Sequence, residues 1–150
     1  MQLSSSVEIN ASRQDIWNTI TDWENLADHI SGIQSVEILE KPQSGIVGFK
    51  WKETRVMFGK EASETMWVTD ATEPNYYQVG AASRGSEYET TFRILGDSQP
   101  YQLEMDFKGT PQTTGAKVMN ALVGWMFKGA ARKALHQDLE DIKSHLEKSE

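Results

Sequence analysis

The chain has 150 residues, with 15 Lys and Arg against 22 Asp and Glu, so its formal net charge is −7 at pH 7. The length and the 38% hydrophobic content are typical of one folded domain, which we take to span residues 1–150. The acidic balance argues against nucleic-acid binding, which needs a basic face. The absence of cysteine excludes disulfides, thiol nucleophiles and cysteine-based zinc sites.

The sequence shows no targeting or membrane-spanning signal. Residues 1–6 lack the basic start and apolar run of a secretory signal. The longest uncharged apolar stretch covers residues 118–127, well below the roughly 20 residues that span a bilayer. We therefore expect a cytoplasmic protein without a transmembrane segment.

The first quarter of the chain predicts one strand and two short helices. Val7 and Ile9 alternate with Glu8, which predicts a strand over residues 3–9. Ser12 is a favourable N-cap for a first helix. A second short helix is expected from residue 21 to the Ser and Gly at 31–32. The apolar residues of the two helices recur at helical spacing: Ile16, Trp17, Ile20, Trp23, Leu26, Ala27 and Ile30.

From about residue 33 the apolar period changes to two, which is the period of a strand. Turns rich in Gly and Pro separate the alternating runs, so we expect an antiparallel meander. The expected strands run from 33 to the turn at 42–45 and over 46–57, 61–72, 76–82, 87–95 and 101–108.

The last quarter, residues 115–148, is predicted to be helical. Leu135, Leu139, Ile142 and Leu146 form an apolar stripe, and the remaining faces are charged. Residues 118–127 are apolar almost all round, which indicates either burial on several sides or an exposed adhesive face.

This order of elements predicts an α+β fold with the helices on one face of an antiparallel sheet. A twisted sheet that wraps around one helix leaves a hollow where it curves away, although the same spacing fits a filled core equally well. An apolar pocket with a few inward polar groups is the usual form of a small-molecule site. The candidate ligand-binding residues are Trp51, Glu53, Arg55, Met66, Tyr88, Phe92, Met105, Phe107, Leu122 and Met126.

Three segments resemble the START-like, or SRPBCC, superfamily, which includes polyketide cyclase-like proteins and the birch-pollen-allergen fold. Residues 12–17 (SRQDIW) with 21–26 (TDWENL) resemble its opening. GFKWKETR at 48–55 looks like the third strand of its bacterial polyketide-cyclase-like members, and ARKALHQDLEDIK at 131–143 is similar to their C-terminal helix.

The resemblance covers essentially the whole chain. It implies a helix-grip fold, in which a curved antiparallel sheet of about seven strands wraps around a long C-terminal helix, with two short helices after the first strand. It also implies a hydrophobic ligand cavity between the sheet and the last helix. It transfers no catalytic residue, because the superfamily holds both carriers and enzymes.

Glu53 and Arg55 lie two residues apart on the strand face that also carries Trp51. Inward charges are costly unless they are paired, so a structural ion pair is one interpretation. Alternatively, the two side chains fix the polar head of an apolar ligand, or Glu53 acts as a general acid or base. With the opposite strand register, both would be solvated.

The histidines give no site of their own. His136 with Glu140, and Asp141 with His145, have the i, i+4 spacing of metal ligands, but a solvated helix face explains them more simply. His29 ends the second helix, where the helix dipole favours it. The glycines at 80, 85 and 96 are expected in or beside hairpin turns and form no phosphate loop. We expect neither a metal nor a cofactor.

Three functions remain open. The favoured one is a non-catalytic carrier of a small hydrophobic molecule, such as a lipid, an isoprenoid or an aromatic polyketide, because no catalytic set is assembled. The second is a cyclase, dehydratase or isomerase that uses Glu53, with Arg55 or Tyr88 stabilising an enolate. The third is a protein–protein adaptor that uses residues 118–127. Peripheral membrane contact through residues 125–127 is a further expectation, with the chain a monomer or a homodimer.

Overall fold

The computed structural model describes residues 2–57, 59–83, 86–111 and 114–148, with side chains described outside positions 57, 60, 83, 86, 110–111 and 114–130. Seven strands and three α-helices follow one another in the predicted order, with a short 3-10 helix, η1, before α2. The elements are β1 (Gln2–Ile9), α1 (Arg13–Ile20), η1 (Trp23–Asn25), α2 (Leu26–His29), β2 (Ile33–Glu40), β3 (Lys50–Met57), β4 (Lys60–Thr72), β5 (Tyr76–Ser83), β6 (Ser86–Leu95), β7 (Tyr101–Pro111) and α3 (Thr114–Lys148).

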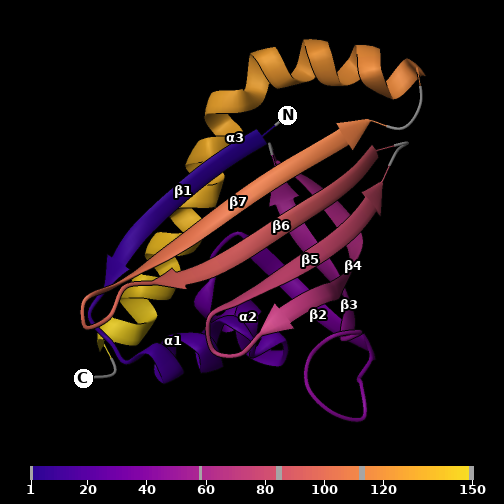
Figure 1. The fold of residues 1–150 in the computed structure, drawn as a ribbon. Coiled ribbons are helices and arrows are strands. Elements are labelled where there is room, and N and C mark those ends of the chain that lie inside the picture. Colours follow the sequence, from indigo (N-terminus) through magenta and orange to yellow (C-terminus); the bar gives the residue numbers. More distant parts are fainter. Residues whose placement is uncertain (1, 58, 84–85, 112–113, 149–150) are drawn as a thin grey trace.

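The strands form one antiparallel sheet in the order β1-β7-β6-β5-β4-β3-β2, so the first strand pairs with the last. Figure 1 shows the C-terminal part of α3 lying against one face of this curved sheet, while α1 and α2 close one end. The N-terminal part of α3 changes direction and extends over the opposite end (Figure 1). This architecture confirms the predicted helix-grip fold.

The first helix forms as the sequence predicts. The Ser12 hydroxyl accepts a hydrogen bond from the backbone N–H of Asp15 at 3.0 Å, which caps the first turn. Ile16 and Ile20 are fully buried beneath the sheet. The expected second helix is divided into η1 and a single turn of α2, and the Trp23 side chain in η1 is buried in the core.

Two local predictions are wrong. The third strand begins at Lys50 and not at residue 46, because Gly48 adopts a positive φ of 94° in the preceding turn. Gly80 lies inside β5 and not at a turn. A Cβ there would come within 3.1 Å of the Trp67 ring, so glycine lets that indole lie flat on the sheet.

The buried core lies between the concave face of the sheet and the helices. Three residues of the predicted apolar stripe on α3, Leu139, Ile142 and Leu146, are buried there. They pack with strand residues such as Ile9 and Leu103, both fully buried. Within the residues that the structure describes, no helix is long and apolar enough to cross a membrane.

Candidate functional site

A cavity of about 310 Å³ lies between the sheet and α3. Among the residues whose side chains the structure describes, its walls come from five strands and from α3. The lining residues are Leu3, Glu53, Arg55, Ala62, Glu64, Met66, Tyr88, Thr90, Met105, Phe107, Ala131, Ala134, Leu135 and Asp138. Ligand sites in proteins commonly measure roughly 300–1,000 Å³, so this outer cavity reaches the lower end of that range.

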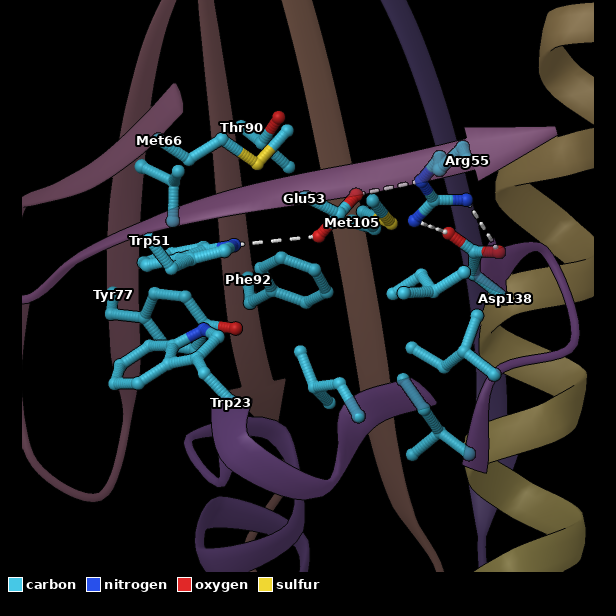
Figure 2. Close-up of a pocket in the computed structure, with 15 residues that line it drawn as sticks. Trp23, Trp51, Glu53, Arg55, Met66, Tyr77, Thr90, Phe92, Met105 and Asp138 are labelled. Carbon is cyan, nitrogen blue, oxygen red and sulfur yellow. Dashed lines mark hydrogen bonds and ion pairs between the residues drawn. The ribbon is translucent and has the colours of Figure 1, made fainter. Parts of the chain in front are cut away.

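A second, smaller pocket of about 70 Å³ lies toward α2 and η1. Figure 2 shows its lining, in which the rings of Trp23, Trp51, Tyr77 and Phe92 face one another. The two pockets share a common wall, which consists of Glu53, Arg55, Met66, Thr90, Met105 and Asp138. The predicted hollow is therefore present, and polar groups divide it into an inner and an outer compartment.

Glu53, Arg55 and Asp138 form an ion cluster in this common wall (Figure 2). The Arg55 Nε donates to Glu53 Oε2 at 2.7 Å, while Nη1 and Nη2 donate to the two Asp138 oxygens at 3.2 and 2.7 Å. The Trp51 Nε1 donates a longer bond of 3.5 Å to Glu53 Oε1. One guanidinium therefore connects β3 to α3 across the cavity.

Burial shifts the pKa values of groups in this cluster. Glu53 and Asp138 are each 6% exposed. Burial raises the pKa of Asp138 above its usual range, and this effect outweighs the attraction of Arg55. Burial acts to lower the pKa of Arg55, but Glu53 and Asp138 outweigh it and raise that pKa, so the guanidinium stays charged.

Aromatic rings fill the inner compartment. Trp23 stacks on Trp51 at 4.9 Å between centroids and contacts Phe49 at 4.6 Å. Tyr77 stacks on Phe92 at 5.0 Å, and its hydroxyl donates to the Ile20 carbonyl at 2.8 Å. Burial raises the pKa of Tyr77, so this phenol stays protonated.

The structure brings together eight of the ten predicted ligand-binding residues. Trp51 and Phe92 line the inner compartment, and Tyr88 and Phe107 line the outer one. Four line both, namely Glu53, Arg55, Met66 and Met105. The side chains of Leu122 and Met126 lie outside the described residues. Binding by these residues remains a prediction.

Among the lining residues that are missing from the predicted site, two are charged, Asp138 and Glu64. The expectation of charged outer faces on the last helix does not separate Asp138 from its solvated neighbours. Yet Asp138 lies three residues after Leu135 and four before Ile142, within the apolar stripe. Glu64 lies directly opposite Glu53 in the β3–β4 register and two residues before Met66. Both spacings place the residues inward, so the sequence does carry a signal for them.

The histidines lie apart from this cavity. His136 pairs with Glu140 at 3.4 Å on an exposed face, as the simpler interpretation predicts. His29 stacks on His145 at 3.7 Å between ring centroids, which connects α2 to the end of α3. Asp141 accepts hydrogen bonds from the N–H and the hydroxyl of Ser31. Among the described residues, no group of three or more candidate ligands could hold a metal ion.

Solved structures of similar fold come from several organisms. The aromatase/cyclase Zhui of Streptomyces sp. R1128 is 14% identical, with a TM-score of 0.81 over 98% of this chain and 93% of that one. TTHA0849 of Thermus thermophilus is 12% identical, with a TM-score of 0.81 over 99% of both chains. A START superfamily protein of Mycobacterium smegmatis is 19% identical, with a TM-score of 0.63 over 94% of this chain and 98% of that one.

At these identities the likeness establishes the fold alone, and it agrees with the superfamily that the sequence motifs resemble. No protein among those with curated descriptions matches the sequence. Residues 1–148 match the sequence pattern of the family described as polyketide cyclase / dehydrase and lipid transport. Because that match spans nearly the whole chain, the protein belongs to this family.

Proposed function

We propose that the protein binds and carries a small hydrophobic ligand, such as a lipid, an isoprenoid or an aromatic polyketide, in the outer cavity. The observation that carries the proposal is the cavity of about 310 Å³ between the sheet and α3. Most of its lining consists of apolar side chains, with the ion cluster at one end. Apolar walls with a few convergent polar groups are the usual composition of such sites.

The first test of this proposal is the binding of a neutral apolar probe. N-phenyl-1-naphthylamine should bind to the purified protein with a rise in fluorescence. Ala134→Phe places a ring in the outer cavity and should weaken probe binding at least about tenfold. The matched control is Ser144→Phe, which adds the same ring at an exposed position of the same helix and should leave probe binding unchanged.

Equal probe binding by wild type and Ala134→Phe would contradict the proposal. Native mass spectrometry of gently purified protein is an independent test. Added mass that organic extraction removes is expected, and the same treatment of Ala134→Phe should show less of it.

An acid–base enzyme of the cyclase or dehydratase type is the second candidate, and one observation favours it. Asp138 borders both compartments, and burial raises its pKa, so its proton is available at higher pH than that of an ordinary carboxyl group. Asp138 is therefore a candidate acid beside Glu53, and both carboxyl groups accept hydrogen bonds from Arg55. If Asp138→Asn turned over an identified substrate at the wild-type rate, this role would be wrong.

The adaptor function depends on side chains at 118–127, which lie outside those described. It stays a prediction, together with the oligomeric state and any contact with a membrane surface. Light scattering over a range of concentrations tests the homodimer.

A further inference from the structure

The charged groups of the outer cavity are mostly acidic. Among the lining residues that the structure describes, three carry carboxyl groups, namely Glu53, Glu64 and Asp138, and only Arg55 carries a positive charge. Glu53 and Glu64 face each other directly across β3 and β4. Two carboxylates in this arrangement repel each other, and a further anion beside them would add to the repulsion.

Arg55 would normally be the receptor for an anionic head group, since its guanidinium matches a carboxylate or phosphate. Here three of its N–H groups already donate to Glu53 and Asp138. Its Nη1 also lies 3.2 Å from the position that a Cβ of residue 32 would occupy, so the backbone at Gly32 restricts approach from that side. Two of its five N–H groups make no such bond, but the two carboxylates already offset its charge, so an anionic ligand would gain little from Arg55.

The cavity does offer acceptors. The carboxyl groups of Glu53, Glu64 and Asp138 border it, and carboxylate oxygens accept hydrogen bonds from a ligand. Tyr88 and Phe107, stacked at 5.6 Å between centroids, form an aromatic wall of the same cavity. Carboxylates beside aromatic faces form an environment that attracts cations, because the ring faces carry partial negative charge.

We infer that the outer cavity selects apolar ligands whose polar end donates hydrogen bonds, a protonated amine above all, and that it discriminates against carboxylates. This inference rests on the proposed function and adds the chemical class of the ligand's polar end. It sets aside free fatty acids as ligands and favours apolar amines first and apolar alcohols second.

The test uses three ligands with the same chain and different ends: decylamine, decanol and decanoate. Each is titrated below its micelle concentration at neutral pH, and displacement of N-phenyl-1-naphthylamine gives its affinity. Decylamine should bind at least about tenfold more tightly than decanoate, with decanol between them. Equal affinity for all three, or the tightest binding by decanoate, would overturn the inference and leave the proposed function standing.

A failure of the proposed function has a different signature. In that case Ala134→Phe would not weaken the binding of the probe or of any of the three ligands. The inference would then fail together with the proposed function.

A pair of variants tests whether the preference for decylamine over decanoate arises in the outer cavity. Glu64 is only half-buried, so Glu64→Gln should fold, and we expect it to reduce the preference for decylamine over decanoate at least about threefold. Glu61→Gln removes the same charge from the same strand, but its side chain is exposed and outside the cavity lining. It should leave the preference unchanged. If both variants reduce the preference equally, the selectivity reflects net charge and not the cavity, and the inference is overturned.

Discussion

The space between the sheet and α3 is filled at one end and hollow at the other. Toward α2 and η1 the inner compartment measures about 70 Å³, whereas the outer cavity beside Ala131 and Ala134 measures about 310 Å³. Four strands, β3, β4, β6 and β7, contribute to both compartments. The strands alone therefore do not decide where the molecule is hollow.

The difference arises from the layer that covers the sheet. At the filled end, η1 places Trp23 against Trp51, and α3 contributes Leu139 and Ile142. At the hollow end, the same face of α3 presents Ala131 and Ala134. The boundary is Asp138: before it this face of α3 carries two alanines beside Leu135, and after it the stripe consists of large residues. Side-chain volume on the covering helix thus determines whether a ligand has room.

Substitutions in the ion cluster between the two compartments should have the largest effect on stability. Arg55→Met leaves Glu53 and Asp138 buried without their cation, and the free energy of unfolding should fall by about 3–5 kcal/mol. Urea unfolding followed by tryptophan fluorescence measures the loss. The triple variant Arg55→Met, Glu53→Gln, Asp138→Asn removes all three charges and should recover much of it. A loss below about 1 kcal/mol in the single variant would mean that the cluster is not an integral wall.

Two leucines on α3 sharpen the contrast between the ends. Leu139 is fully buried at the filled end, and Leu139→Ala should lower the free energy of unfolding by about 2–5 kcal/mol. Leu135 lies one turn earlier and borders the outer cavity, so Leu135→Ala should cost only about 1 kcal/mol or less. The same denaturation experiment compares them. Equal losses would show that the outer cavity is closed in solution.

The alternation of apolar residues was enough to predict the sheet and the shared face of Trp51, Glu53 and Arg55, and the stripe at helical spacing predicted the long helix. The spacing did not decide whether that face of β3 points inward. Trp51 and Glu53 are both buried, as the shared face of that strand implies. The resemblance to the superfamily added the prediction of a cavity, because periodicity alone does not distinguish a cavity from a filled core. A filled core and a lined pocket have the same apolar spacing, because a side chain points inward in both.

The features that the sequence did not predict depend on contacts between distant parts of the chain. Asp138 is 83 residues from Arg55 in sequence, so only the fold could show that they pair. The shortened β3 and the position of Gly80 depend on a positive φ at Gly48 and on the Trp67 ring. The glycine at 48 permits that φ but does not require it, and the contact of Gly80 with Trp67 depends on the pairing of β4 with β5.

The boundary should also respond to pH. Burial raises the folded-state pKa of Asp138, so its contribution to stability is present at acidic pH and is lost as the pH rises through that pKa. The difference in unfolding free energy between wild type and Asp138→Asn should therefore shrink as the pH rises from about 4. Asp141 provides the matched control. Burial acts to raise its pKa, but hydrogen bonds from Ser31 and Gln137 outweigh this and lower it, so its contribution to stability is lost only as the pH falls below about 4. Asp141→Asn should therefore show little change above that pH and the opposite trend below it. If the two variants showed the same dependence on pH, the raised pKa of Asp138 would be contradicted.

The smallest expected effect concerns the histidine pair that joins α2 to α3 at the filled end. Burial and the neighbouring His145 lower the pKa of His29, and this outweighs the opposing effect of Asp22 and Asp28. Because the unfolded chain then binds a proton more readily, stability should decline as the pH falls through about 6.5. His29→Phe keeps a ring on His145 at 3.7 Å but cannot titrate, so its thermal midpoint should vary less between about pH 7.5 and pH 5.5. If the variant keeps the full wild-type slope, then α2 and α3 are not coupled through this pair, and the acid sensitivity of the filled end lies in other groups.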